Sequence, residues 1–409
     1  MAEPDPSGER TSPLPFIVGS PIALKGTARA PLSRVAIDFL GFGARFVAFR
    51  NGLGYRYSGD ALDALDLTTG RRRWTSESGE CFPPVAFTAN DVVICGNSGL
   101  YVLSQGDGHH ITAIRDAGSV AVVNGVLYAK TLNGFGAYDA QTFKPKWESP
   151  VAGEGVFEIP TLYGGTVLQK YVHHGPPPWG TLYAYDARSG KYLWQREAYA
   201  ELAFERDAVY LDATHETAEY FPKKQIDKVN IFTGKTVNSY TYFPDGSQNV
   251  LTGPPFDGPD VHVAGGFVYL VVAGNNLWYR YDVDRAPNKA HPVRLQGIKN
   301  IAAVLGNGSF LVDMPYGAGI AFPFPHQLVF HDLNLGARRS SVVRSGEEAY
   351  VVLGTTLVKF DESGQPFVVG TMACPTIDDI FPAESRVAVF CSDMQQRTRE
   401  GVVFADASP

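Results

Sequence analysis

One short motif recurs along this chain and constrains its fold more than any other feature. Three copies share an aspartate, a threonine or serine three residues later and a tryptophan eight residues later: Asp66–Trp74, Asp139–Trp147 and Asp186–Trp194. In two of them, glycine stands four residues after the aspartate. Weaker copies begin at Asn230, Asp332 and Asp361, and degenerate ones lie near Ser104 and Asp282. These residue types are typical of a hairpin turn, because Asp accepts bonds from amides two residues on and Gly adopts a positive φ.

Two short apolar runs precede each of these turns, as in Asp91–Ile94 with Leu100–Leu103, or Phe267–Val272 with Leu277–Tyr281. We therefore predict that each unit forms a small antiparallel sheet. The pattern recurs at roughly 40-residue spacing, which is the length of a four-stranded propeller blade. We predict an all-β chain that forms a single β-propeller of four-stranded antiparallel blades, most simply eight, with seven or nine left open.

The two ends of the chain are expected to meet. The last pair of runs, Arg386 to Ala405, can share a composite blade with the N-terminal segment, a closure that leaves no open sheet edge. We therefore divide the chain into a flexible N-terminal segment, residues 1–30, and a propeller, residues 31–409.

The Asp-x-x-Thr-Gly-x-x-x-Trp repeat resembles the PQQ-type propeller repeat, and the resemblance spans nearly the whole chain. Proteins with this repeat include quinoprotein alcohol dehydrogenases and the BamB-type outer-membrane assembly lipoprotein, so the resemblance implies a fold but not a function. Many such dehydrogenases place two adjacent, disulfide-linked cysteines against the quinone, whereas this sequence has neither a Cys-Cys pair nor a Cys-x-x-Cys-His haem motif. We expect no PQQ and no other cofactor. A structural calcium stays open, although the acidic pairs at 282/284 and 378/379 lack the full spacing of a calcium loop.

Composition excludes several classes of partner. Hydrophobic residues make up 44% of the chain and charged residues 19%, which suits a core-forming protein. The formal net charge of -7 offers no basic stripe for a phosphate backbone, so we expect no nucleic-acid partner. No apolar stretch approaches the roughly 18 residues that a membrane helix needs. The polar, proline-rich stretch Met1–Pro15 carries no signal core, so the protein is either cytoplasmic or exported with its signal removed.

The four cysteines favour export. Cys81 and Cys95 flank one pair of strand-like runs, and Cys374 and Cys391 bracket the corresponding pair in another unit. If these runs are the first two antiparallel strands of a blade, each pair comes within disulfide range. We predict bridges Cys81–Cys95 and Cys374–Cys391, with free buried cysteines as the alternative. Disulfides would place the protein in the periplasm or outside the cell.

Topology indicates which face to consider for binding. Because strands alternate in direction, the repeat turns fall on one face, while the loops between second and third strands and the linkers between blades fall on the other. Several of those opposite loops are long and aromatic, and binding residues concentrate in such loops. The candidate ligand or partner face contains eight residues: His173, His174, Trp179, His215, Tyr220, Phe322, Phe324 and His326.

Several of these residues also have other interpretations. Adjacent histidines in a strand point to opposite faces, so His173 and His174 are not expected to bind one metal. Trp179, which follows three prolines, could stack on a sugar ring or an aromatic peptide side chain. The sequence Asn307-Gly308-Ser309 matches a glycosylation acceptor, but so short a motif is common by chance.

Catalytic motifs are missing from the sequence: it contains no Gly-x-Ser-x-Gly elbow, no phosphate-binding loop, no His-Glu-x-x-His pair and no dinucleotide fingerprint. Propeller enzymes, however, assemble their sites from isolated side chains around the central channel. We expect a monomeric, non-catalytic exported propeller that binds a protein or glycan partner through its loop-rich face, in the manner of a scaffold. The alternatives are a lyase, hydrolase or isomerase acting on a glycan or small molecule, and a cytoplasmic protein-interaction propeller.

Overall fold

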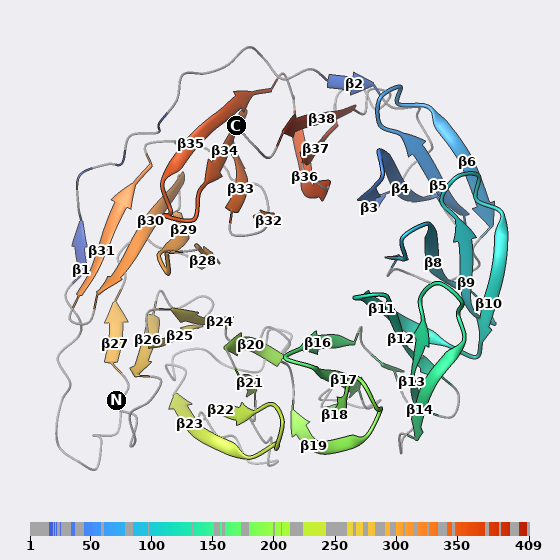
Figure 1. Cartoon of the computed structure of the whole chain (residues 1–409). Helices are drawn as coiled ribbons and strands as arrows, with labels where there is room; N and C mark the ends of the chain where they lie inside the picture. The colour runs from blue at the N-terminus through green and yellow to red at the C-terminus, as the bar shows by residue number, and fades with distance from the viewer. Residues whose placement is uncertain are drawn as a thin grey trace, which may run out of the picture.

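The computed structural model is built from β-strands, and no helix occurs in the part of the chain it describes. The described residues are 16–18, 20, 22, 25, 34–36, 45–58, 61–77, 85–96, 98–131, 134–150, 156–157, 160–172, 180–198, 201–205, 207–212, 224–242, 260–264, 267–272, 277–282, 291–294, 300–305, 307–314, 317–324, 327–333, 342–345, 348–372, 376–383, 386–392 and 401–406. These strands group into small antiparallel sheets around a central opening, which confirms the predicted all-β propeller (Figure 1).

The first three blades follow one another without insertion. Blade 1 has β3 (Arg45–Arg50), β4 (Leu53–Ser58), β5 (Ala61–Asp66) and β6 (Arg72–Glu77). Blade 2 has β7 (Ala86–Phe87), β8 (Asp91–Gly96), β9 (Gly99–Ser104) and β10 (His110–Arg115). Blade 3 has β11 (Gly118–Val123), β12 (Val126–Thr131), β13 (Gly134–Asp139) and β14 (Pro145–Pro150).

The next three blades contain longer connections. Blade 4 has β15 (Val156–Phe157) and β16 (Thr161–Tyr163), which both pair with β17 (Thr166–Val172), then β18 (Gly180–Asp186) and β19 (Tyr192–Ala198). Blade 5 has β20 (Glu201–Glu205), β21 (Ala208–Asp212), β22 (Lys224–Asn230) and β23 (Thr236–Tyr242). Blade 6 has β24 (Asp260–Ala264), β25 (Phe267–Val272), β26 (Leu277–Asp282) and β27 (His291–Arg294).

The last three blades receive additions from the N-terminal segment. Blade 7 has β28 (Asn300–Val304), β29 (Phe310–Met314), β30 (Gly317–Phe324) and β31 (Gln327–Asp332), with β1 (Phe16–Val18) outside β31. Blade 8 has β32 (Val343–Ser345), β33 (Glu348–Leu353), β34 (Thr356–Phe360) and β35 (Pro366–Thr371). Blade 9 has β36 (Thr376–Ala383), β37 (Arg386–Ser392), β38 (Gly401–Asp406) and β2 (Arg34–Ala36) as its outermost strand.

The described strands thus form nine sheets, and the preferred count of eight blades was wrong. The composite blade itself is present, because β2 pairs antiparallel with β38. The N-terminal segment contributes a single outer strand there, so the last pair of runs forms a sheet of its own with β36 innermost. That inner strand also contacts β3 of blade 1 and β32 of blade 8, which closes the ring.

Apolar side chains are buried mainly between neighbouring blades. One cluster joins blades 1 and 2 around Tyr55, Trp74 and Ile94, and another joins blades 8 and 9 around Tyr350 and Val389. Similar clusters connect blade pairs 2–3, 3–4, 4–5 and 7–8. Each blade therefore buries both of its faces only when a neighbour stands on either side.

The repeated tryptophan holds neighbouring blades together. Trp194 of blade 4 donates its indole N–H to the carbonyl of Ile231 in the repeat turn of blade 5, at 2.8 Å. Trp74 and Trp147 make the same bond to Gln105 and Ala187 of the following blades, at 2.9 and 3.2 Å. The glycine of the receiving turn lies under the ring, since a Cβ on Gly234 would meet Trp194 Cγ at 2.5 Å. The tryptophan of one copy of the motif and the glycine of the next copy thus form a single inter-blade contact.

An exception supports this interpretation. Blade 2 has Thr112 where blades 1, 3 and 4 have tryptophan, and the receiving turn of blade 3 has Phe143 where glycine is expected. Phe143 adopts a φ of 55° and packs against the apolar cluster between blades 2 and 3. Where the donor ring is missing, the receiving turn supplies an aromatic ring instead.

Blades 5 and 8, which lack the tryptophan, have polar contacts at the equivalent register. Ala64, Ala137 and Ala184 stand opposite the three tryptophans, but the same position of the third strand holds Lys228 in blade 5 and Lys359 in blade 8. Lys228 Nζ lies 3.4 Å from a Glu205 carboxylate oxygen, which also accepts a 2.9 Å bond from Tyr210. Lys359, Glu348 and Tyr350 repeat this arrangement. Blades 5 and 8 therefore share an arrangement that differs from that of blades 1, 3 and 4.

One weak repeat copy was placed wrongly. Asp332 ends β31, the fourth strand of blade 7, and so does not begin a turn between the third and fourth strands. In blade 7 that turn joins Phe324 to Gln327. Asp332-Leu-Asn-Leu-Gly336 lacks the threonine and tryptophan of the motif. The prediction of a repeat turn there depended only on the spacing of aspartate and glycine.

The tryptophan–glycine contact predicts unequal effects of two alanine substitutions. Gly234 and Gly52 have φ angles of +67° and +72°, but a Cβ meets nothing within 4 Å at Gly52. We expect Gly52→Ala to lower the free energy of unfolding by about 1 kcal/mol through backbone strain alone. Gly234→Ala should cost about 3 kcal/mol, because it also displaces Trp194. Urea unfolding of both variants measures the difference, and equal losses would contradict the docking role.

Candidate functional site

Most of the predicted loop-face residues lie outside the described residues. His173, His174 and Trp179 fall in the connection between β17 and β18, His215 and Tyr220 fall in that between β21 and β22, and His326 falls between β30 and β31. The surface that these side chains form stays a prediction.

Phe322 and Phe324 were assigned to a long loop, and that assignment was wrong. Both belong to β30, where Phe322 pairs with Val329 and Phe324 with Gln327. Their end of the blade is the repeat-turn end, because Asn307, between β28 and β29, bonds to Ser363 in the repeat turn of blade 8. The alternating prolines suggested a loop, but β29 pairs with β30 only up to Ala321. Beyond it β30 has one neighbour, and an edge position tolerates proline.

The glycosylation acceptor motif is part of the same contact between blades. The Asn307 side-chain amide donates to the Ser363 carbonyl at 2.5 Å, and its oxygen accepts bonds from the Ser309 amide and hydroxyl. A glycan on this nitrogen would break the tie to blade 8. Asn307 therefore has a structural role here.

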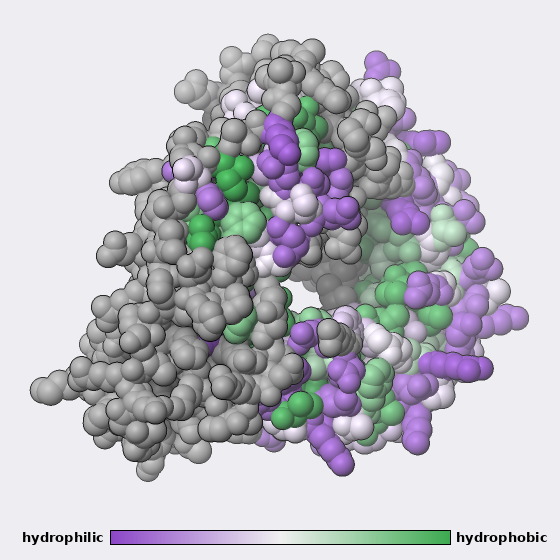
Figure 2. Space-filling model, turned by 60° about the vertical axis from the view of Figure 1, so that its left-hand side comes forward, coloured by the Kyte–Doolittle hydropathy of each residue, from purple (hydrophilic) through white to green (hydrophobic). Residues whose placement is uncertain are grey.

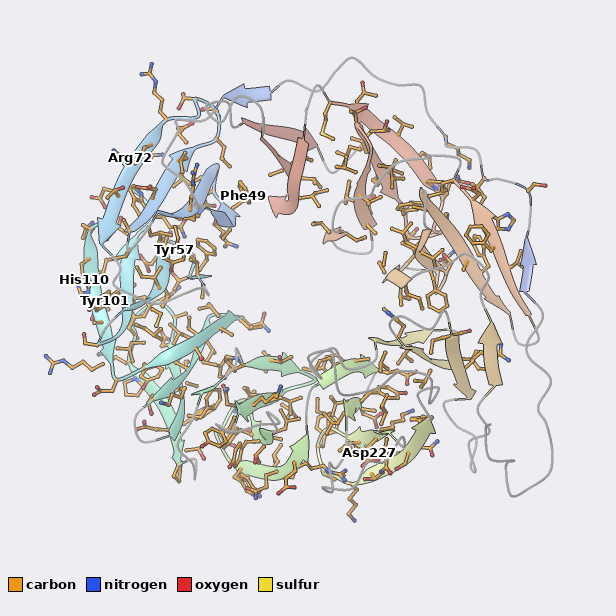
Figure 3. All side chains as sticks on the ribbon, turned by 180° about the vertical axis from the view of Figure 1, so that it is seen from behind. Phe49, Tyr57, Arg72, Tyr101, His110 and Asp227 are labelled. Atoms are coloured by element: carbon orange, nitrogen blue, oxygen red, sulfur yellow. The ribbon has the colours of Figure 1, made fainter. Side chains whose placement is uncertain are left out.

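The inner strands around the central opening contain several ionisable residues, among them Arg50 of β3, Glu205 of β20 and His262 of β24. Space-filling atoms leave the ring hollow at its centre (Figure 2). Phe49 of β3 faces this side of blade 1, whereas Arg72 and His110 lie on outer strands (Figure 3). Glu205 is paired with Lys228, and His262 of β24 packs near the Phe310 ring. No group of three metal-ligating side chains occurs within the described ranges.

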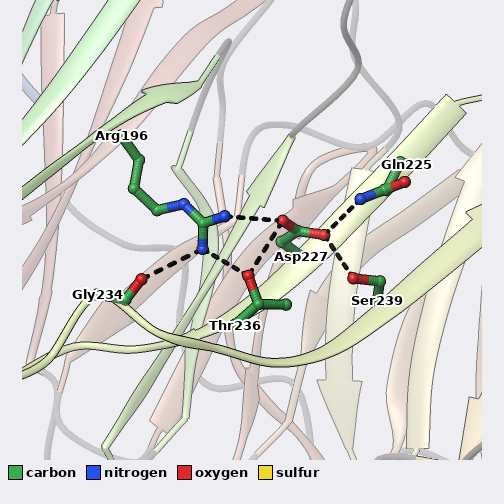
Figure 4. Close-up of polar contacts among 6 residues, drawn as sticks. All are labelled: Arg196, Gln225, Asp227, Gly234, Thr236 and Ser239. Carbon is green, nitrogen blue, oxygen red and sulfur yellow. Dashed lines mark hydrogen bonds and ion pairs between the residues drawn. The ribbon is translucent and has the colours of Figure 1, made fainter.

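A buried carboxylate joins blades 4 and 5 from the outer side. Asp227 of β22 accepts bonds from Gln225 and Ser239 on one oxygen, and its other oxygen lies 3.3 Å from Arg196 of blade 4 (Figure 4). Arg196 also donates to Thr236 at 2.7 Å and to the Gly234 carbonyl at 3.3 Å. Every polar group in this network has a partner within the two blades, so it acts as an inter-blade tie.

Asp63 of blade 1 occupies the equivalent repeat position, three residues before its turn. It accepts a bond from Thr75 and lies 3.7 Å from Arg72. Burial raises the pKa of Asp63, while Arg72 and the fully buried Arg56 oppose that rise. Recurrence of the same carboxylate in two blades indicates an architectural role for it.

The outer edge of blades 7 and 8 carries an extended segment of the chain itself. The described residues 16–18, 20, 22 and 25 are here called the strap, and Phe16–Val18 pair in parallel with Leu328–Phe330 (Figure 1). Ile22 N–H donates to the Asp332 carbonyl at 3.1 Å. Lys25 then bonds through both its amide and its carbonyl to β35, at 3.0 Å each. These contacts fall within residues 1–30, which we had described as flexible; the domain boundary itself stays a prediction.

Side chains add to these main-chain bonds. The strap carbonyl of Ser20 lies 2.7 Å from His331 Nδ1, and the His331 ring packs edge-on against Phe322 at 5.5 Å. Ile22 packs on the apolar cluster of blades 7 and 8 that includes Phe322, and Lys25 Nζ lies 5.8 Å from the centre of the Phe367 ring. Phe322 thus packs against the side chain that meets the strap.

Cys95 is disulfide-bonded. Cys81 and Cys374 lie outside the described residues, so both predicted pairings stay predictions. No helix in the described part of the chain has the length and apolar character to cross a bilayer.

The repeated turn, the four-stranded blades and the tryptophan–glycine contact define a β-propeller of PQQ-type repeats. Residues 58–288 match the family model described as outer membrane protein assembly factor BamB. The chain belongs to this family. The match covers the three tryptophan-bearing turns of blades 1, 3 and 4.

Several solved structures are similar to the chain at low identity. BamB from Moraxella catarrhalis is similar at 14% identity with a TM-score of 0.43, covering 79% of this chain and 96% of that one. Hsv2 from Kluyveromyces lactis has 9% identity and a TM-score of 0.38, covering 74% of this chain and 100% of that one. A structure described as the eukaryotic initiation factor has 10% identity and a TM-score of 0.46, with coverages of 83% and 89%. None of the curated proteins matches the chain.

Removing the Asp227 carboxylate should destabilise the junction of blades 4 and 5. Asp227→Ala removes the anion beside Arg196 and leaves three hydrogen-bond donors without their acceptor. We therefore expect the free energy of unfolding to fall by about 3 kcal/mol. Lys235→Ala, at an exposed position nearby, should change it by less than about 0.5 kcal/mol. Differential scanning calorimetry distinguishes the two. A near-neutral Asp227→Ala would show that the network contributes little.

His262 should make stability fall on acidification. Burial lowers the pKa of His262 to about 4, and its Nε2 has no hydrogen-bond partner in the described region. The unfolded chain, with a histidine pKa of about 6.5, binds the proton first, so stability is full above about pH 6.5 and declines below it. We expect a loss of about 2 kcal/mol between pH 7 and 5 that disappears in His262→Phe. His109→Gln, on an exposed turn, should retain it, and an unchanged pH slope in His262→Phe would refute the assignment.

Proposed function

We propose that this protein is a monomeric, non-catalytic β-propeller that is exported and binds a protein or glycan partner through its loop-rich face, as an assembly scaffold does. The observation that carries the proposal is the uneven length of the connections between second and third strands. Two residues suffice in blades 1, 2, 3, 7 and 8, namely 59–60, 97–98, 132–133, 315–316 and 354–355. Blades 4, 5 and 9 use 173–179, 213–223 and 393–400 instead.

These connections are longer than joining two strands of a blade requires, because a two-residue hairpin joins the equivalent strands in five other blades. The connections of blades 4 and 5 belong to neighbouring blades and to the same face of the ring. They contain His173, His174, Trp179, His215 and Tyr220. Long loops held by a rigid scaffold are where binding residues concentrate.

Other features agree with a scaffold. The buried carboxylates Asp63 and Asp227 and the Glu205–Lys228 pair are engaged in contacts within and between blades. The family model bears the name of an outer-membrane assembly factor, a protein-binding role. Export is supported by the disulfide at Cys95, because disulfides persist in oxidising compartments.

Site-specific photocross-linking tests the proposed face. A photoreactive phenylalanine analogue replaces Trp179 on the loop-rich face or Lys144 on the repeat-turn face of blade 3. In exporting cells we expect a discrete protein adduct, or retention on a glycan array that Trp179→Ala abolishes, from the first position only. Adducts of equal yield from Lys144, with no glycan retention, would count against the loop-rich face. Recovery of the protein with free thiols in the cytoplasmic fraction would count against export.

A further inference from the structure

One part of the chain bonds to the outer strands of three consecutive blades. Phe16–Val18 pair with β31 of blade 7, Lys25 bonds to β35 of blade 8, and Arg34–Ala36 pair with β38 of blade 9. The strap and β2 together are here called the latch. In blades 1 to 6 the outermost described strand is the blade's own fourth strand. The latch is therefore confined to blades 7 to 9.

These blades lack the contact that joins blades earlier in the chain. The described indole bonds run from blade 1 to 2, from blade 3 to 4 and from blade 4 to 5, and residues 300–409 contain no tryptophan. In the repeat turn of blade 8, a Cβ on Gly364 would meet Asn307 Nδ2 of blade 7 at 2.8 Å. At this junction an amide side chain thus takes the place of the ring.

The junction of blades 8 and 9 cannot have a turn contact of either kind. The third strand of blade 9 is β38 and its fourth is β2, and these two strands are not consecutive in the chain. No hairpin turn connects them, so blade 9 offers no repeat turn to blade 8. The apolar cluster around Tyr350 and Val389 and the contact of β32 with β36 join the two blades from within. The latch adds a tie on the outside.

The latch docks on sheets that are built without it. Strands β28 to β31, β32 to β35 and β36 to β38 pair among themselves, and the latch meets only their outer members. Its contacts are also distant in sequence, since Ser20 and His331 are 311 residues apart. Closing so long a loop costs entropy, and contacts of this kind form late. A short segment with few bonds at each blade should also be among the first to open.

We propose that the latch is a conformational device that controls opening of the ring. While docked, it holds blades 7, 8 and 9 together as one unit. Its release lets the ring open at these blades, while the blades joined by tryptophan stay closed. Opening between blades 8 and 9 exposes a face of each, and a blade without its neighbour is not stable by itself. This device is independent of the proposed binding face.

Substitutions that differ in the main-chain amide test the latch in the full chain. Ile22 and Lys25 donate their amide N–H groups to the carbonyls of Asp332 and Pro366. The double variant Ile22→Pro, Lys25→Pro removes both donors, whereas Ile22→Val, Lys25→Ala keeps them and is the matched control. Hydrogen–deuterium exchange followed by mass spectrometry compares β29, β33 and β37 with β4, β12 and β18 in the same sample.

Release of the latch should appear as local opening. We expect β29, β33 and β37 to exchange at least about tenfold faster in the proline variant than in the control, because exchange of buried strands reports their opening equilibrium. Exchange of β4, β12 and β18 should not change. The single variant Lys25→Pro should give a smaller increase of the same kind, and it provides the test if circular dichroism shows that the double variant is unfolded.

Three results would overturn the proposal. Equal exchange in the proline variant and the control would mean that the latch amides do not hold these blades. Acceleration by the same factor in all blades would show a general contribution to stability and no local latch. Acceleration limited to β31, β35 and β38 would mean that the segment only covers an edge. The loop-rich face is unaltered in every variant, so these outcomes bear on the latch alone.

Discussion

Contact between the tryptophan of one blade and the turn glycine of the next is the interaction on which the rest of this structure depends. A small four-stranded sheet cannot bury both faces by itself, so it is stable only between neighbours. The indole bonds from Trp74, Trp147 and Trp194 fix each turn against the preceding blade and thereby set the spacing of the ring. Phe143 packs between blades 2 and 3, where tryptophan is absent. The Lys–Glu–Tyr groups of blades 5 and 8 instead join strands within one blade.

Much of the fold was predictable because the turns have local chemistry. Asp139 illustrates this: it accepts bonds from the Gln141 and Thr142 amides, and those bonds lower its pKa to about 2. A turn of this kind can be predicted from nine consecutive residues of the sequence. The composite closure was also predictable, because the C-terminal runs lacked one strand.

Features that depend on packing were not predictable in this way. Phe322 looked like a loop residue because prolines surround it, and only the limited reach of β29 explains its place in a strand. Asp332 had the aspartate of a repeat turn but stands one strand too late. The role of Lys228 became visible only in the register that places it opposite Tyr210, since sequence spacing gives no sign of a partner on another strand.

The ring closes where β36 meets blades 1 and 8, and the N-terminal segment adds the outermost strand of blade 9 and the strap beside blades 7 and 8. An experimental density map of the purified full chain tests this most directly. It should show nine sheets of four or five strands, with Arg34–Ala36 hydrogen-bonded to β38 and Phe16–Val18 beside β31. A ring of seven or eight sheets, or an N-terminal segment detached from blades 7 and 9, would contradict it.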